Sequence, residues 1–353
     1  MRAMKAIVKT KKGMGNVELQ ELPVPDIGDN EVLIKVEAAA VCGTDLHILH
    51  DKFPYWPPVT LGHEFAGVIA AIGSGVKEWK AGDRVVGEPH TLACGSCYYC
   101  RTGNIQNCLQ KRSPGWGING CFAEYLRYPE PKLLHKLPDS IGFIEGALIE
   151  PLANVVTDMV ERGSITAGDS VVIIGPGPIG LMAGITAHAC GASKVILIGT
   201  RADKEVRIPI AKSLQVFDDI LLAEENDCVN AILKHTNGLG ADIVVEASGS
   251  QGGIGTGIQM LRKYGRFIGI GLPNLENIQF PYNDAMKKVL TIICNMSTSY
   301  TSWERAISLM GTNKEKFLGL VTQGGSLTNW QKYFEMLDAQ KCMKVVFTPQ
   351  APL

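Results

Sequence analysis

The sequence has no excess of charge of either sign and no long apolar run. It contains 34 Lys and Arg against 35 Asp and Glu, giving a net charge of -1. Because a nucleic-acid binder needs a basic patch and none is visible, we expect no nucleic-acid partner. No stretch approaches the roughly 18 uninterrupted apolar residues of a membrane helix, so we expect no membrane segment. The apolar part of residues 1–9 is too short for the core of a signal peptide.

Cysteine is too sparse for a disulfide scaffold. There are 10 cysteines in 353 residues, and several of them are clustered, which favours metal binding or catalysis in a reducing compartment. We therefore expect a cytoplasmic protein. Hydrophobic residues make up 46% of the chain and charged residues 20%, so a large core is possible, and the length predicts about two domains.

Two patterns of secondary structure divide the chain near Pro151. Residues 1–150 contain short β-like runs separated by Gly and Pro, which predicts a β-rich unit. Examples of these runs are residues 31–36, 67–73 and 83–86. Residues 151–290 alternate between apolar strands and helices, which predicts a doubly wound parallel sheet covered on both faces. The strands are expected at 170–174, 194–198, 242–247 and 265–270, and helices at 181–190 and 204–214, the last despite Pro209. Residues 291–353 are expected to return to the first unit.

Four closely spaced cysteines give the strongest chemical signal. Cys94, Cys97 and Cys100 form a C-x2-C-x2-C pattern that is followed by Cys108. Four thiolates make the closed tetrahedral sites of structural zinc, so we predict a zinc ion here. An iron–sulfur cluster uses similar spacing, but no other feature indicates electron transfer. Unliganded cysteines on a loop are the remaining alternative.

Three further potential metal ligands are scattered through the first unit. Cys42 follows a predicted strand, His63 lies in a Gly-His-Glu sequence, and Glu150 precedes Pro151. A Cys, a His and a carboxylate can hold zinc while leaving a fourth position open, which is the arrangement of a catalytic site. Taken singly, each is equally compatible with an ordinary structural residue.

A glycine-rich motif indicates a dinucleotide. Gly175-Pro-Gly177-Pro178-Ile179-Gly180 follows the strand that ends at Ile174 and opens a helix. In this context the glycines allow the backbone to approach a pyrophosphate at the helix N-terminus. The Gly238–Gly240 and Gly252–Gly255 segments have no preceding predicted strand and are interpreted as loops.

The residues after the next strand bear on the choice of cofactor. A carboxylate is expected about 20 residues after the glycine motif, to bind the adenosine ribose 2′-hydroxyl of NAD. The sequence instead has Gly199, Thr200 and Arg201, which offer space, a hydroxyl and a guanidinium for a phosphate. This favours NADP over NAD. The alternative is that Arg201 is solvated and Asp203 binds the ribose.

Together these motifs resemble the zinc-dependent medium-chain alcohol dehydrogenase family over nearly the whole chain, and within it the sorbitol (polyol) and L-threonine dehydrogenase branch. The branch marker is Glu150, where the classical alcohol dehydrogenases have Cys. The resemblance implies a GroES-like β-rich catalytic domain and a Rossmann dinucleotide-binding domain. It also implies two Zn²⁺ ions per chain, NAD(P) as cofactor and a homodimer or homotetramer.

The resemblance also implies roles for individual residues. The catalytic zinc ligands would be Cys42, His63 and Glu150, with Glu64 able to approach the metal, Asp45 orienting His63, and Thr44 and His47 forming a proton relay. The structural zinc ligands would be Cys94, Cys97, Cys100 and Cys108. The cofactor contacts would be Gly175, Gly177, Pro178, Ile179, Gly199, Thr200, Arg201, Ala247, Ser248, Gly249, Ile270, Gly271 and Leu272.

The implied reaction is hydride transfer between a secondary alcohol (a sugar, polyol or related hydroxy compound) and NAD(P), giving the ketone. Residues 295–302 carry hydroxyls but no Arg, where the polyol branch commonly has one. This suits a neutral polyhydroxy substrate, with L-threonine as the alternative. Tyr55, Trp56 and Trp116 are candidates for lining the cleft or for loop packing. The rival classes are a non-catalytic NADPH-binding protein and a metal-independent quinone or enoyl reductase, neither of which needs the full ligand set.

Overall fold

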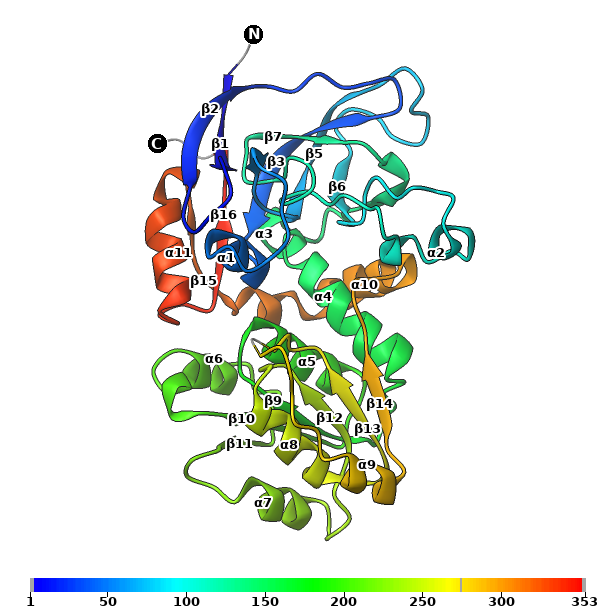
Figure 1. Cartoon of the computed structure of the whole chain (residues 1–353), viewed down its shortest axis with the longest axis vertical. Coiled ribbons are helices and arrows are strands. Elements are labelled where there is room, and N and C mark those ends of the chain that lie inside the picture. The colour runs from blue at the N-terminus through cyan, green and yellow to red at the C-terminus, as the bar shows by residue number, and fades with distance from the viewer. Residues whose placement is uncertain (1–2, 274, 351–353) are drawn as a thin grey trace. The chain divides into compact units, whose positions relative to one another are not determined.

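The structure, a computed structural model, describes residues 3–273 and 275–350. The ends of the predicted domains, at residues 1–2 and 351–353, lie outside this description. The chain divides into two compact units (Figure 1). Unit 1 comprises Met1–Ala153, Ser297–Lys314 and Val321–Leu353, and unit 2 comprises Asn154–Met296 and Glu315–Leu320. The boundaries predicted from the sequence lie after residues 150 and 290.

Unit 1 is built on two sheets. A three-stranded sheet has the order β2-β1-β4, and a seven-stranded sheet has the order β15-β16-β3-β5-β6-β8, with β7 also paired to β3. The strands are β1 (Ala3–Lys9), β2 (Val17–Pro23), β3 (Val32–Ala40), β4 (Val59–Thr60), β5 (Glu64–Ile72), β6 (Arg84–Gly87), β7 (Tyr125–Tyr128), β8 (Leu134–Lys136), β15 (Val321–Gly325) and β16 (Lys344–Phe347). The three β-like runs predicted from the sequence overlap β3, β5 and β6, and each extends one residue beyond the strand that the structure has.

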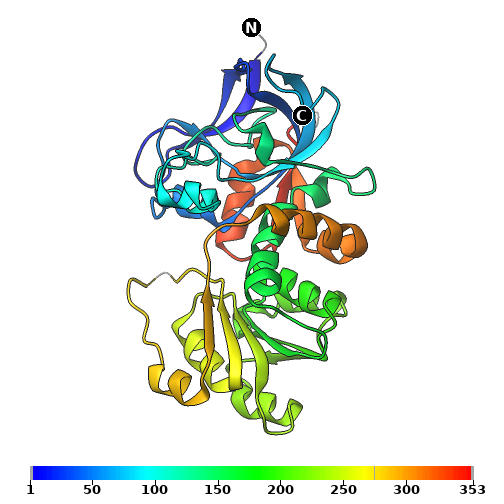
Figure 2. The same cartoon turned by 90° about the vertical axis from the view of Figure 1, so that its right-hand side faces the viewer.

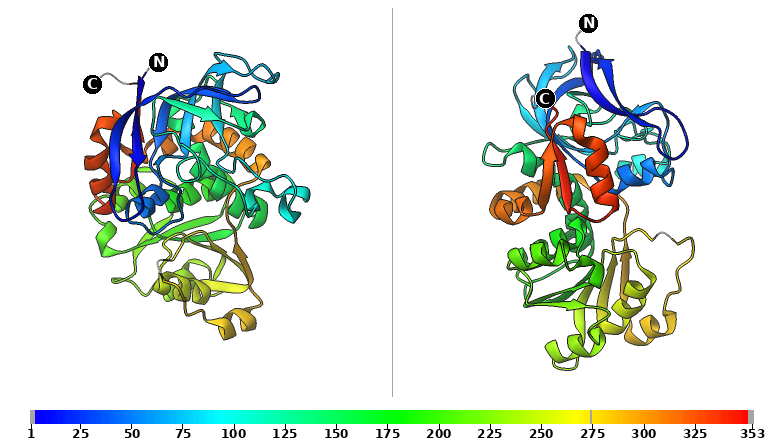
Figure 3. Two further views of the ribbon diagram at one scale, coloured as in Figure 1. Left: turned by 45° about the horizontal axis from the view of Figure 1, so that its top comes forward. Right: turned by 90° about the vertical axis from the view of Figure 1, so that its left-hand side faces the viewer.

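The chain returns to unit 1 at its C-terminal end. Strand β16 pairs antiparallel with β3, where Val346 lies opposite Ala40, so a late segment completes a sheet begun by an early one (Figure 3). The helices that lie wholly or partly in unit 1 are α1 (Gly43–Leu49), α2 (Tyr98–Arg101), α3 (Phe143–Gly146), α4 (Ile149–Val156), α10 (Tyr300–Leu318) and α11 (Trp330–Asp338), with 3₁₀ turns η1 (Ile105–Asn107), η2 (Pro131–Leu133) and η5 (Leu327–Asn329).

Unit 2 contains one parallel sheet. Its order is β11-β10-β9-β12-β13-β14, and each neighbouring pair is parallel. The strands are β9 (Ser170–Ile174), β10 (Lys194–Gly199), β11 (Asp219–Leu222), β12 (Ala241–Glu246), β13 (Leu261–Gly269) and β14 (Thr291–Cys294). The helices are α5 (Pro178–Ala189), α6 (Arg207–Ser213), α7 (Cys228–His235), α8 (Gln251–Met260) and α9 (Tyr282–Lys288), with π-helix η3 (Thr157–Arg162) and 3₁₀ turn η4 (Arg201–Asp203).

Helices cover both faces of this sheet (Figure 2). A Cβ added to Gly184 of α5 would lie 3.5 Å from Ile173, whereas one added to Gly257 of α8 would lie 3.2 Å from Ile174. Because successive side chains of a strand point to opposite faces, α5 and α8 pack on opposite sides of β9. The doubly wound parallel sheet predicted from the sequence is confirmed.

Two local expectations about helices meet different outcomes. The helix expected across Pro209 is present as α6, because Pro209 is its third residue and the first turn needs no backbone N–H from it. The interpretation of Gly252–Gly255 as a loop is wrong, since these residues lie in α8. The Ser250 side chain caps that helix by accepting a 3.0 Å hydrogen bond from the Gly253 N–H. Within the described residues, no helix combines the length and apolarity that crossing a membrane requires.

Candidate active site

A buried aspartate fixes the backbone on either side of the candidate metal site. Cys42 is the N-cap residue of α1, and the Asp45 carboxylate accepts hydrogen bonds from the N–H of Cys42 at 2.9 Å and of Gly62 at 3.2 Å. Asp45 is fully buried, and this burial raises the pKa of its carboxyl group. The Nδ1 atom of His63 lies 3.9 Å from Asp45 Oδ1, so Asp45 faces the imidazole as the family resemblance implies.

A thiol, an imidazole and a carboxylate meet beside this aspartate. The ligand atoms of Cys42, His63 and Glu64 all lie within 4.8 Å of one another. His63 Nδ1 and Glu64 Oε1 are buried and, in the part of the chain that the structure describes, neither has a hydrogen-bond partner. Leaving such polar atoms unsatisfied is costly. A divalent cation would satisfy the Glu64 oxygen, whereas His63 Nδ1 faces Asp45 and leaves the other ring nitrogen for the metal; the donor set suits zinc.

Glu150 lies outside this tight group but acts on it electrostatically. It is buried at the start of α4. Burial by itself lowers the pKa of His63, but the charges of Cys42, Asp45 and Glu150, with a hydrogen bond to Cys42, raise that pKa to about 10. The negative charge around His63 thus favours a positive charge at this position, and a metal ion would compete with a proton for it.

Lys344 is a charged neighbour of the site that the sequence analysis did not identify. Its ammonium group donates to the carbonyl of Val41 at 2.8 Å and to Glu64 Oε2 at 2.5 Å, across 280 residues of sequence in the second case. Burial lowers the pKa of Lys344, but the charges of Glu64, Cys42 and Glu150 raise it above its usual value. Lys344 thus holds one oxygen of Glu64 and leaves the other unpaired.

The two predicted proton-relay residues share helix α1. Thr44 and His47 are three positions apart, so they lie on neighbouring positions of one helical face. The Thr44 hydroxyl oxygen lies 3.7 Å from Cys42 Sγ. A hydroxyl next to the metal ligands and an imidazole farther along the same face can accept and pass on a proton.

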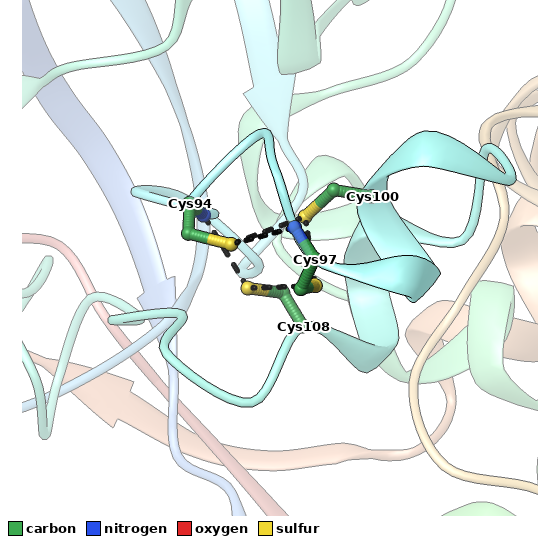
Figure 4. A group of neighbouring side chains, drawn as sticks. All are labelled: Cys94, Cys97, Cys100 and Cys108. Carbon is green, nitrogen blue, oxygen red and sulfur yellow. Dashed lines mark hydrogen bonds between the residues drawn. The ribbon is translucent and has the colours of Figure 1, made fainter.

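The four clustered cysteines converge in space (Figure 4). Their sulfur atoms are 3.9 Å apart for Cys94 and Cys100, 3.6 Å for Cys97 and Cys100, and 4.0 Å for Cys97 and Cys108. Four sulfurs each about 2.3 Å from a central zinc ion would be roughly 3.8 Å apart. Backbone N–H groups, that of Ser96 above all, lower the pKa of Cys94 to about 6. This cysteine lobe (residues 94–108) therefore fits a structural zinc ion.

A second buried polar group ties strands β6 and β8 to helix α10. Glu88 follows β6 and pairs with His90 and, at 2.9 Å, with His135. His135 also bonds Glu304 at 2.5 Å and stacks on the Trp303 ring at 5.3 Å. The sequence analysis did not identify this group, because His135 and Glu304 lie far from Glu88 in the chain.

The glycine motif forms the turn that a pyrophosphate requires. Gly175 has φ +102°, and a Cβ on it would lie 2.9 Å from the Ser248 backbone nitrogen. A Cβ on Gly180 would lie 1.9 Å from the Gly175 carbonyl oxygen, so neither position tolerates a larger residue. Gly177 is the N-cap of α5, with open space around its missing side chain, and Pro178 begins the helix. The free N–H groups of this helix N-terminus can bind an anion.

One buried carboxylate, Glu246, joins the two other loops predicted to contact the cofactor. Its side chain accepts hydrogen bonds from the N–H groups of Ser248 and Gly249, both at 3.0 Å. Its backbone carbonyl accepts from those of Ile270 and Gly271, both at 2.9 Å. Burial raises the pKa of the Glu246 carboxyl group. The sequence identified these loops at the strand ends but not the residue that holds them together.

The segment after β10 uses Asp203 internally. One oxygen of Asp203 accepts from the Thr200 N–H at 2.8 Å and from its hydroxyl at 2.7 Å, and the other pairs with Arg207 at 3.1 Å. Arg201 is largely exposed and lies 3.2 Å from Glu225. The geometry therefore leaves Arg201 as the group that extends outward from the end of this strand.

Comparisons with known proteins agree with the fold and with a zinc-binding enzyme. Residues 28–139 match the family model of the alcohol dehydrogenase GroES-like domain, and residues 178–312 match that of the zinc-binding dehydrogenases. A sorbitol dehydrogenase from Halalkalibacterium halodurans is 36% identical, with 98% of this chain and 99% of the relative covered. An L-threonine 3-dehydrogenase from Bacillus subtilis is 35% identical, with the same coverage of 98% and 99%.

A solved structure supports the same assignment. A zinc-binding dehydrogenase from Sinorhizobium meliloti bound to NADP superposes with a TM-score of 0.90 at 30% identity, covering 99% of this chain and 100% of that one. The GroES-like and Rossmann architecture predicted from the sequence is confirmed by these matches. The chain belongs to the zinc-dependent medium-chain alcohol dehydrogenase family and is an oxidoreductase of that family.

Proposed function

We propose that this enzyme transfers a hydride between a secondary alcohol, such as a sugar or polyol, and NAD(P), giving the ketone. The observation that carries the proposal is the group of half-buried Cys42 with buried His63 and Glu64, whose ligand atoms lie within 4.8 Å of one another. A non-catalytic dinucleotide-binding protein or a metal-independent reductase does not require a group of metal-ligating side chains. The similarity to sorbitol and L-threonine dehydrogenases supports the same substrate range.

Different residues of the chain have different roles in this reaction. Cys42, His63 and Glu150 would hold the catalytic zinc, with Glu64 within reach of the same site and Asp45 orienting His63. When bound, zinc acts as a Lewis acid that favours the alkoxide over the alcohol, and NAD(P) supplies the hydride acceptor.

The remaining steps are movements of protons and charge within the protein. The Thr44 hydroxyl would accept the hydroxyl proton of the substrate while releasing its own proton toward His47 and solvent, a transfer that an imidazole can carry out. Lys344 balances part of the negative charge of Cys42, Glu64 and Glu150. It also holds Glu64 by one oxygen, which leaves room for the substrate oxygen.

A substrate panel tests the proposed reaction. With the zinc-loaded enzyme we expect at least one of sorbitol, xylitol, an inositol or butanediol to give ketone and reduced cofactor in equal amounts. Chelation of the metal should abolish the signal, since the alkoxide loses its Lewis acid. Formation of reduced cofactor is followed by absorbance and the ketone by chromatography. Turnover of L-threonine alone would favour the alternative substrate, and no turnover of any alcohol would contradict the proposal.

We propose that the enzyme prefers NADP to NAD because the Arg201 side chain is exposed and a 2′-phosphate can displace its partner Glu225, whereas Thr200 and Arg207 already engage Asp203. Replacing Arg201 by Ala should lower kcat/KM for NADP⁺ by roughly 10- to 100-fold, the size of a hydrogen bond to a charged group, and should affect NAD⁺ much less. Glu225→Gln should act in the opposite direction, because Glu225 competes for Arg201. A wild-type kcat/KM that is equal or higher with NAD⁺ would contradict this preference.

We further propose that the enzyme is a cytoplasmic homodimer or homotetramer. Strand β14 is an edge strand of the unit 2 sheet, and Ile292 on it is 45% exposed, with Val289 and Met296 beside it at 54% and 59%. An exposed apolar edge is a template for pairing with a second copy, and sedimentation equilibrium measures the number of copies. The ten cysteines form no disulfide within the described residues, which supports a reducing compartment.

A further inference from the structure

A guanidinium group without a carboxylate partner lies over an exposed aromatic ring in unit 1. Arg112 Cζ is 4.0 Å from the centroid of the Trp56 ring, and Trp56 is 47% exposed. The Nη1 atom of Arg112 donates to the carbonyls of Lys111 at 3.2 Å and Gln110 at 3.5 Å. Arg112 forms no ion pair with any residue in the ranges 3–273 and 275–350, so its charge is free to meet an anion from solution.

The backbone holds Arg112 in place. Its N–H donates to the carbonyl of Thr91 at 3.1 Å, and the Thr91 hydroxyl donates back to the carbonyl of Arg112 at 2.7 Å. Thr91 is fully buried, so this two-way contact fixes the segment that carries the guanidinium. A preordered cation loses less conformational entropy when it binds an anion.

Aromatic residues connect this cation to the candidate metal site. The Trp116 ring packs edge-on against the His63 ring, with centroids 4.9 Å apart, and against Phe53 at 5.5 Å. The Trp56 N–H donates to the carbonyl of Trp116 at 2.8 Å. We call Phe53, Trp56 and Trp116 the aromatic wall. Within this wall, Trp116 contacts the proposed zinc ligand His63, and Trp56 lies beneath Arg112. Tyr55, the other aromatic singled out in this stretch, is buried and bonds Asp51 instead.

We propose that Arg112 selects, among substrates of the reaction proposed above, hydroxy compounds that end in a phosphate or carboxylate several bonds from the reacting carbon. A guanidinium pairs with either anion through two parallel hydrogen bonds, and the aromatic wall covers the intervening carbon chain. Arg112 also supplies the cation that is missing from residues 295–302. L-threonine fits this arrangement poorly, because its carboxylate is only two bonds from the carbinol carbon.

The proposal is tested with three substrates that share one polyol chain: sorbitol, gluconate and sorbitol 6-phosphate. The wild-type enzyme should have a kcat/KM at least tenfold higher for one of the two anions than for sorbitol, and the preferred anion identifies the terminal group. Arg112→Met should lower kcat/KM for that anion by 10- to 100-fold, mainly through a higher KM. It should change kcat/KM for sorbitol by less than twofold. Arg112→Lys should recover part of the loss, because it restores the charge without the planar fork.

A matched control and a binding measurement separate this inference from the proposed function. Arg101→Met removes another guanidinium, the exposed one of α2. It should leave kcat/KM unchanged for all three substrates. Titration calorimetry with sorbitol 6-phosphate and gluconate should show at least tenfold weaker binding of one anion to Arg112→Met than to wild type. Equal binding of both anions to the two proteins, or equal losses with sorbitol and with the anions, would overturn the role of Arg112. Absence of turnover with intact anion selectivity in binding would overturn only the proposed reaction.

Discussion

Replacing Cys42 by Ser should abolish turnover while the chain remains folded. The Cys42 sulfur shares a 4.8 Å group with the donors of His63 and Glu64, and a serine hydroxyl is a far weaker zinc ligand than a thiolate. Losing a Lewis acid that contributes several kcal/mol should lower kcat/KM by roughly 10³-fold or more. Steady-state kinetics and metal analysis on the same preparation measure the loss of activity together with the loss of one metal ion per chain.

A matched cysteine variant shows whether this loss is specific. Cys190 is a free, partly exposed thiol that belongs to neither metal group, so Cys190→Ser should keep two metal ions and full turnover. Circular dichroism should give the same folded signal for both variants. Full activity in a Cys42→Ser protein shown by analysis to have lost a metal ion would contradict the proposed chemistry.

Replacing Cys100 by Ser should lower the stability of the protein without removing its catalytic activity. The cysteine lobe (residues 94–108) has short helical turns α2 and η1 and places no fully buried residue in α2, so its order depends on the metal. Structural zinc binding contributes about 10–16 kcal/mol of apparent free energy in small zinc-binding peptides. The variant should therefore lose one zinc ion, become sensitive to proteolysis within the lobe and melt at a lower temperature.

The control for this variant is Asn107→Ala, which changes an exposed residue of the same lobe without removing a sulfur atom. It should keep both metal ions and resist proteolysis as the wild type does. Cys100→Ser molecules that remain folded should still turn over substrate, since the proposed catalytic ligands lie elsewhere in the chain. Unchanged melting and unchanged protease resistance in Cys100→Ser would contradict a structural zinc site.

Features that depend on neighbouring residues were predictable from the sequence. Strand β9 begins and ends where predicted, at Ser170 and Ile174, because strands buried on both faces give an uninterrupted apolar run. The turn at Gly175 was predictable for the same reason: a strand, a glycine turn and a helix follow one another directly. The cysteine lobe is also local, so its spacing alone indicated its geometry.

Features that depend on distant residues were not predictable. Lys344 lies in an otherwise apolar strand, and only the fold brings it to Glu64, 280 positions away in the sequence. The sequence likewise gave no sign that Arg112 lies over Trp56, because neither belongs to a motif. Helix α8 was missed because its glycines have low helix propensity, whereas the cap from Ser250 and close packing of Gly257 against the sheet override that preference.

The roles of the two carboxylates also needed the fold. From the resemblance Glu150 is the ligand and Glu64 a neighbour, yet in the structure Glu64 lies in the tight group with Cys42 and His63. The contact with Lys344 explains how Glu150 can remain the proposed ligand while Glu64 lies in the tight group. Its ammonium group pairs with Glu64, which weakens Glu64 as a ligand and leaves Glu150 to complete the set.

Anomalous diffraction at the zinc absorption edge, on crystals of the zinc-loaded enzyme, tests the shared metal site most directly. Two peaks per chain are expected: one inside the cysteine lobe, and one within bonding distance of Cys42 Sγ, a ring nitrogen of His63 and an oxygen of Glu150. A single peak in the lobe, or a second peak that Glu150 does not reach, would contradict the proposed catalytic centre.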